Sequence, residues 1–207
     1  TGQRRVPASG PPQGPATFEA LASPEDVVWW PPAEALVVAM AGLHQLWLFD
    51  PRAGAVSVLA GTGGEQLRDG PASRALLAQP TALVVHPDGA LWWVDAESSS
   101  VRRLDAGAGG VTTAVGAGLF AHGHVDGAVA DALLQHPQGV AVLPDGALLV
   151  SDTYNGALRR VDVARGQVAT VARGLQEPVA AVPGVDGGWL VAESAASRLT
   201  HVQLSEP

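Results

Sequence analysis

Two histidines and an aspartate, each separated by one residue, come closest to a metal site. They are His122, His124 and Asp126. Imidazole and carboxylate groups on one loop can reach a common ion. Two histidines rarely suffice, so a further ligand such as His136 would have to come from elsewhere. An ordered connecting loop explains the same residues without a metal, and we favour this interpretation because short motifs often match by chance.

Acidic residues recur at equivalent positions, each after a short apolar segment: Asp95, Asp152 and Glu193. They could form a ring of general bases or metal ligands. They could instead accept backbone N–H groups at the corner after a strand, as aspartate does in turns. Catalysis needs an acid once or twice, whereas these recur regularly. We therefore expect a structural role, and the same for Gly139.

Further candidates for binding are Tyr154 and Asn155, which we place in a corner, with Asn155 in the left-handed conformation. The tryptophans include two adjacent pairs, at 29–30 and 92–93. Neighbours on a strand point to opposite faces, so Trp30 and Trp93 are candidate interface anchors. Packing of both members inside the fold is an equal alternative.

The sequence contains no nucleophile elbow, phosphate loop or HExxH motif. We therefore predict no catalytic residue and no cofactor, and we expect the chain not to be an enzyme. The alternative is a propeller hydrolase or lyase. Its metal would be held by His122, His124 and Asp126, or near Glu25 and Asp26.

These residues are carried by a repeat anchored on a proline. Each anchor has a leucine three residues earlier, and the spacings between anchors are 56, 57 and 41 residues. The anchors are Pro24, Pro80, Pro137 and Pro178. In the last three copies an Asp-Gly pair begins eight residues after the proline, which is typical of a tight hairpin turn. Strand repeats of this length indicate a propeller or a solenoid.

The repeat predicts an all-β fold, a β-propeller of four-stranded antiparallel blades. The expected strands are 25–30, 36–40, 45–50 and 55–60; 81–86, 90–94, 100–104 and 111–115; 139–143, 147–151, 157–162 and 167–172; and 179–182, 188–192 and 198–204. Residues 1–13 are expected to form a loop or extended arm. The blades are expected at about 14–60, 61–115, 116–172 and 173–207, the last without its fourth strand. Segments 71–78 and 128–135 have the composition of one helical turn.

Small residues at the start of each first strand should let the blades converge at the propeller axis. The positions there are Asp26, Ala82, Gly139 and Ala180. They leave few side chains at the axis that could hold a metal.

The third copy, HPQGVAVLPDGALLVSDTYNGALRRVD, resembles the NHL repeat. The resemblance rests on Pro137, Gly139, Asp145, Gly146, Asp152, Thr153, Asn155, Arg160 and Asp162. Segments 39–47, 95–104 and 119–140 are similar to the propellers of thioredoxin–NHL proteins. That resemblance implies a six-bladed ring, to which this chain would contribute the later blades. The resemblance does not imply thioredoxin activity for this chain, because the chain has no cysteine.

Composition limits the partners. The net charge is −8 and the arginines are scattered, so a nucleic acid, which needs a basic surface, is not expected. No apolar run reaches the roughly 20 residues that span a membrane. The lack of cysteine is compatible with a reducing compartment, and we favour the cytoplasm. The absence of lysine and isoleucine indicates a GC-rich genome. We expect a protein or peptide partner, together with self-association or pairing with a missing N-terminal part.

Overall fold

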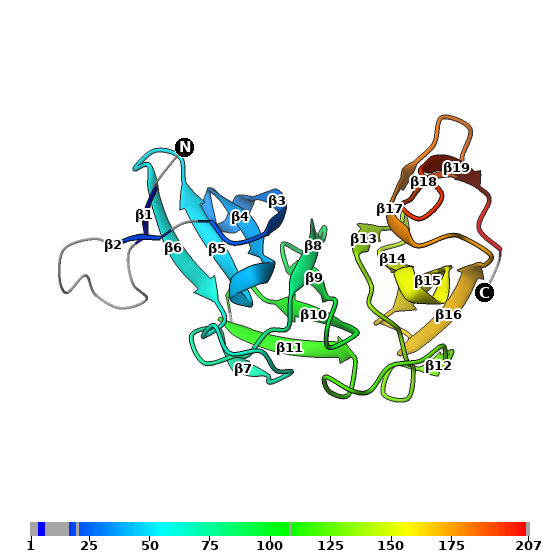
Figure 1. The fold of residues 1–207 in the computed structure, drawn as a ribbon, viewed down its shortest axis with the longest axis horizontal. Coiled ribbons are helices and arrows are strands. Elements are labelled where there is room, and N and C mark those ends of the chain that lie inside the picture. Colours follow the sequence, from blue (N-terminus) through cyan, green and yellow to red (C-terminus); the bar gives the residue numbers. More distant parts are fainter. Residues whose placement is uncertain (1–3, 7–16, 20, 108, 206–207) are drawn as a thin grey trace.

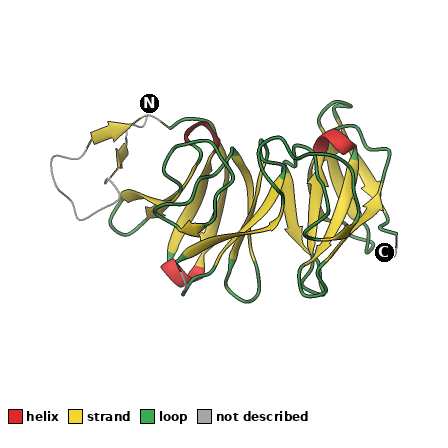
Figure 2. Ribbon diagram, turned by 90° about the horizontal axis from the view of Figure 1, so that it is seen from below, coloured by secondary structure: helices red, strands yellow, loops and turns green. Residues whose placement is uncertain are grey.

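Four antiparallel sheets follow one another along the chain as the blades of a β-propeller (Figures 1 and 2). This computed structural model describes residues 4–6, 17–19, 21–107 and 109–205. The first and last sheets lie at opposite ends of the arrangement (Figure 1). The predicted all-β propeller of about four blades is confirmed.

The strands agree with the predicted ones to within two residues at each end. Blade 1 contains β3 (Pro24–Trp30), β4 (Ala35–Met40), β5 (Gln45–Asp50) and β6 (Ala55–Ala60). Blade 2 contains β8 (Pro80–Val85), β9 (Leu91–Asp95), β10 (Ser100–Leu104) and β11 (Gly110–Val115). Blade 3 contains β13 (Gly139–Val142), β14 (Leu148–Asp152), β15 (Ala157–Asp162) and β16 (Gln167–Ala172). Blade 4 has three strands in the described chain, β17 (Pro178–Pro183), β18 (Trp189–Glu193) and β19 (Arg198–Val202).

Two short strands within the connections between blades were not predicted. β7 (Gly70–Pro71) and β12 (Gly127–Ala128) pair with the outermost strands β11 and β16. Each is followed by one turn in which a backbone N–H bonds the carbonyl four residues earlier, Ala75 to Pro71 and Ala132 to Ala128. The expected helical turns are therefore single turns at the ends of added strands.

The N-terminal arm is described only in part. β1 (Arg4–Val6) pairs with β2 (Thr17–Glu19), and the rest of the predicted arm at 1–13 lies outside the described residues. The described residues also include three short 3-10 turns, η1 (Pro31–Ala33), η2 (Ala41–Leu43) and η3 (Thr153–Asn155). The described residues contain no helix long and apolar enough to cross a membrane.

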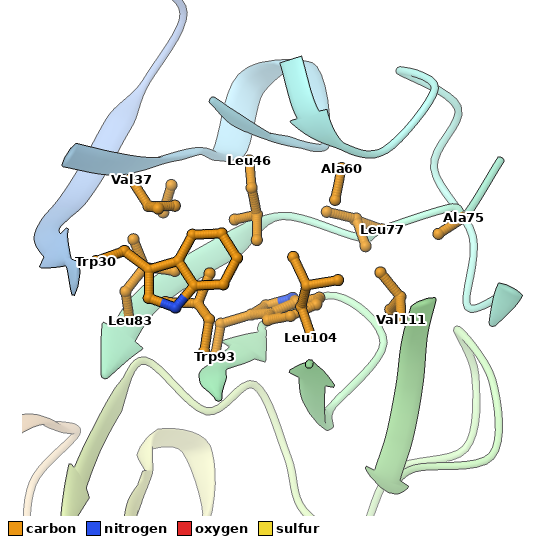
Figure 3. Packing of buried hydrophobic residues seen from close by; sticks show 12 residues of the cluster. Trp30, Val37, Leu46, Ala60, Ala75, Leu77, Leu83, Trp93, Leu104 and Val111 are labelled. Carbon is orange, nitrogen blue, oxygen red and sulfur yellow. The ribbon is translucent and has the colours of Figure 1, made fainter. Parts of the chain in front are cut away.

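Neighbouring blades pack face to face through apolar side chains. Between blades 1 and 2 the cluster includes Val37, Leu46, Leu77, Leu83 and Leu104 (Figure 3). Equivalent clusters lie between blades 2 and 3 and between blades 3 and 4. The burial of this apolar area is the main favourable contribution to holding the blades together.

Left-handed backbone marks the same two places in the repeat. The residue before each anchoring proline has φ near +50°: Ser23, Gln79, His136 and Glu177. The corner between the second and third strands also ends in a left-handed residue: His44, Ser99, Gly156 and Ser197. In blade 3 this residue is Gly156 (φ 58°), so the prediction that Asn155 adopts this conformation is wrong. Glycine adopts a positive φ at little cost.

The innermost strands approach closely at the axis. A Cβ atom at Gly139 would lie 2.5 Å from the carbonyl oxygen of Val179 and 2.8 Å from Oγ of Ser151. Thus the absence of a side chain at Gly139 allows β13 of blade 3 to approach β17 of blade 4.

We predict that Gly139→Ala lowers the free energy of unfolding by about 1–3 kcal/mol, because the new methyl group meets backbone that cannot move aside. Chemical denaturation measures the change. The matched control is Gly107→Ala, since a Cβ there would meet nothing within 4 Å. Equal stability of the two variants would contradict close packing at the axis.

Candidate functional site

In blades 2 and 3 the recurring acidic residues bind buried arginines. Asp95 accepts a hydrogen bond from Arg102 at 2.9 Å, and Asp152 accepts one from Arg159 at 2.7 Å. All four side chains are fully buried. In blade 4, Glu193 accepts hydrogen bonds from Arg198 and Thr200. The recurring carboxylates are therefore all engaged in hydrogen bonds with side chains of their own blade.

Each buried arginine also holds the connection that precedes its blade. Arg159 donates to Asp126 at 2.7 Å and to the carbonyl oxygens of Val125 and Leu133. Arg102 donates to Asp69 at 3.1 Å and to the carbonyl oxygens of Arg68 and Leu76. Each network thus fastens the connection to the sheet that follows it.

The pKa values of these carboxylates reflect their different surroundings. Burial raises the pKa values of Asp95 and Asp152, against the lowering effect of their arginines. The hydrogen bond from Arg198 is the main cause that lowers the pKa of Glu193 to about 2. The buried pairs lack access to solvent, which a general base needs to exchange protons with a substrate.

The predicted loop candidates do not converge on one point. Asp126 bonds Arg159 and Thr170, and its counterpart one repeat earlier, Asp69, bonds Arg102 and Thr113. Nε2 of His124 lies 2.9 Å from Thr170 Oγ1 and 3.0 Å from a nitrogen of Arg173. Within the described ranges no three His, Asp or Glu side chains are placed to hold a metal. Asp126 is therefore part of the blade architecture.

The carboxylate at the axis is also engaged. Asp26 accepts a hydrogen bond from the backbone N–H of Leu83 at 2.7 Å, which joins blades 1 and 2. It is thus a structural link between two innermost strands.

His122 and Tyr154 share a groove that we name the rim groove. It lies where the connection 116–136 meets the corners of blades 2 and 3, and its volume is about 350 Å³. Its walls are formed by Glu65, Ala96, Glu97, Ser99, Leu119, Phe120, His122, Gln135, His136 and Tyr154.

Two aromatic side chains in the rim groove are strongly exposed. Phe120 is 92% exposed and Tyr154 is 57% exposed. The ring of His136 stacks on that of Tyr154, with centroids 4.4 Å apart and planes 10° apart. Burial is the main cause that lowers the pKa of His136, so it is predominantly neutral near pH 7. The groove combines flat rings with the carboxylates of Glu65 and Glu97.

The other sequence candidates lie elsewhere. Asn155 donates to the carbonyl oxygen of Gly123 and to Asp152, so its side chain ties the corner to the connection. Trp30 and Trp93 are 5% and 0% exposed and belong to the core between blades 1 and 2. Trp29 is the exposed member of the first pair, at 48%. Because both side chains are buried, Trp30 and Trp93 cannot contact a partner.

The face of blade 1 that points away from blade 2, which we call its outward face, is apolar at positions where the other blades carry charged residues. Met40 and Trp47 occupy the positions of Asp152 and Arg159. They form a hollow of about 660 Å³ with Val38, Phe49, Val56 and neighbouring residues. The corresponding faces of blades 2 and 3 are covered by the preceding blade.

The family assignment follows from the third blade. The NHL repeat model matches residues 134–160, which include most of β13 to β15 and the buried Asp152–Arg159 pair. The chain is an NHL-repeat β-propeller. The resemblance found in the sequence is thereby confirmed.

Two curated proteins illustrate its relationships. Protein SUPPRESSOR OF QUENCHING 1, chloroplastic, from Arabidopsis thaliana is 32% identical over 92% of this chain and 20% of that protein. NHL repeat-containing protein 2 from Gallus gallus is 35% identical over 72% of this chain and 22% of that protein. The propeller described here thus spans about a fifth of the length of these relatives.

A solved structure of a gluconolactonase from Xanthomonas campestris has a similar fold. The TM-score is 0.67 at 16% identity, over 90% of this chain and 62% of that chain. At this identity the likeness shows the fold alone.

Sequence reasoning missed two parts of these sites. The buried arginines follow their aspartates by seven residues in both blades, a spacing that could have revealed them. No sequence pattern marks Phe120, Glu65 and Glu97, because the rim groove forms only when two connections fold against the corners of blades 2 and 3.

We predict that Arg159→Met lowers the free energy of unfolding by about 3–5 kcal/mol, because Asp152 would remain buried without its partner. The double variant Asp152→Met/Arg159→Met should be clearly more stable than the single variant, since an apolar pair needs no compensating charge. Denaturant titration measures both.

Arg165→Met is the control, because Arg165 pairs with Asp162 but its side chain is 77% exposed. Exposed pairs contribute little, about 0–1 kcal/mol. A loss for Arg159→Met no larger than the control's would refute the buried network as a main fastening.

Proposed function

We propose that this propeller is a non-catalytic interaction module that binds a protein or peptide in the rim groove. The observation that carries the proposal is the exposure of Phe120 and Tyr154 on the walls of one groove. Exposed aromatic side chains next to a concavity are typical of protein interfaces. His122 lies on the same wall and would contact the same partner.

The backbone around the rim groove is held in place before any partner arrives. The N–H of Tyr154 bonds the carbonyl oxygen of Gln135, and that of Glu97 bonds the carbonyl oxygen of Ala78. The N–H of His136 donates to Ser99 Oγ at 3.1 Å. A preformed site loses less conformational entropy on binding, which favours a role as a rigid platform.

The arrangement of ionisable groups supports binding over catalysis. The recurring acids are engaged by arginines, and Asp126 and His124 have protein partners. We therefore do not extend the hydrolase or lyase alternative to this chain. The net charge of −8 argues against a nucleic acid partner. In the relatives a propeller of this kind belongs to a longer chain, and we propose the same setting here, within a thioredoxin–NHL protein.

Selection of random peptides on the immobilised chain tests the rim groove. We expect selected peptides to bind at least tenfold more weakly to Tyr154→Ala and to Phe120→Ser. Fluorescence anisotropy of the labelled peptides gives the affinities. Both side chains are largely exposed, so the variants should fold normally. Trp29→Ala is the matched control, since it removes an exposed aromatic away from the groove and should leave binding unchanged. Peptides that bind both groove variants as tightly as the wild type would refute the proposal.

We further propose that the outward face of blade 1 packs against blade 4 of a second copy of the chain. The argument is repetition, because the equivalent faces of blades 2, 3 and 4 are each covered by a neighbouring blade. Blade 4 presents apolar side chains of its own, with Val182 54% and Leu199 66% exposed. Such head-to-tail contacts differ on the two partners and can extend beyond a dimer.

Light scattering coupled to size-exclusion chromatography tests this association. At micromolar concentration we expect a mass of two or more chains that falls on dilution. Val38→Glu, within the hollow, should shift the protein to the monomer because a charge would be buried in the contact. Val163→Glu, at a site outside the hollow that is 37% exposed, should not. A wild-type monomer at this concentration would contradict the proposal.

A further inference from the structure

The rim groove carries negative charge that the protein does not neutralise with arginine. Elsewhere in the described chain, carboxylates pair with eight arginines: Arg52, Arg102, Arg103, Arg159, Arg160, Arg165, Arg173 and Arg198. The described residues that line the groove include no arginine. The nearest basic group to Glu97 is Nδ1 of His136 at 3.7 Å. Glu65 and Glu97 are thus available to a cation from outside.

The aromatic walls suit a flat cation. The stacked pair of Tyr154 and His136 presents a planar surface, and the exposed ring of Phe120 lies on the same groove. A guanidinium group stacks on such rings and also donates paired hydrogen bonds to carboxylates. The groove volume of about 350 Å³ is near the lower end of the usual range for ligand pockets, about 300–1,000 Å³. It therefore suits a side chain better than a large cofactor.

The protein uses the same chemistry within its own fold. The guanidinium carbon of Arg103 lies 5.3 Å from the ring centroid of Trp92, and its Nη2 contacts both Asp88 and Asp105. An arginine set against a ring and flanked by two carboxylates is therefore stable on the surface of this propeller.

We infer that the rim groove binds an arginine side chain of its partner, stacked on the aromatic walls and paired with Glu65 and Glu97. This inference rests on the proposed function, because it names the group that the peptide or protein partner inserts. A neutral side chain of the same shape would keep the stacking and lose the ion pairs.

The experiment uses the only tyrosine of the chain as a probe. Tyr154 is that tyrosine, so labelling with 3-fluorotyrosine gives a single fluorine NMR resonance within the groove. The labelled protein is titrated with N-acetyl-arginine amide and, separately, with N-acetyl-citrulline amide, which is neutral and nearly the same shape. We expect a saturable shift with the arginine compound and at least tenfold weaker binding of the citrulline compound.

Charge removal separates the ion pairs from the stacking. Glu65→Gln/Glu97→Gln should weaken binding of the arginine compound at least fivefold. Glu34→Gln, which removes an exposed carboxylate paired with Arg52, should leave it unchanged. Equal binding of the arginine and citrulline compounds, or no effect of the double variant, would overturn the inference. Selected peptides that still require Tyr154 would in that case leave the proposed function standing. If the selected peptides bind the groove variants as tightly as the wild type and the arginine compound also fails to bind, both the proposed function and this inference are refuted.

Discussion

A buried arginine between strand and connection is the interaction on which the arrangement of blades 2 and 3 depends. Arg102 and Arg159 each join an aspartate at the end of the second strand to an aspartate in the preceding connection. Removing these charges from water is costly, and the cost is offset by the two aspartates and by carbonyl oxygens that accept further N–H groups of each guanidinium. The arginine thereby fixes a long connection, which also anchors itself through buried apolar residues such as Leu77 and Leu134. The rim groove is built from these connections, so its shape follows from the same fastening.

Much of the fold could be predicted from the sequence because the physical signals are local and repeated. Asp-Gly turns, alternating apolar strands and the anchoring prolines act within a few residues of each other. The strand limits were accordingly correct to within two residues. The short strands β7 and β12 were missed, because two residues carry no periodicity and their pairing depends on a distant outer strand.

The candidate site was only partly predictable, since it depends on contacts through space. His122 and Tyr154 stood out because they differ from the repeat, and both line the rim groove. Asp126 also stood out, yet it is a regular element once Asp69 is recognised as its counterpart. Because neighbouring residues on a strand point to opposite faces of the sheet, the two tryptophans of each pair were expected on opposite faces. Which face a neighbouring blade covers could not be read from that alternation, so Trp29 was overlooked and Trp30 chosen.

The replacement of the charged pair by Met40 and Trp47 gives blade 1 a different kind of boundary. Separating blade 2 from its preceding connection would strip the partners from a buried guanidinium, which makes that boundary slow and costly to open. The outward face of blade 1 has no such group at the equivalent positions, so a neighbour could leave it without stranding a charge. If a second chain packs there, as we propose, its exchange should be easier than opening the boundaries that precede blades 2 and 3, where the buried arginines Arg102 and Arg159 lie.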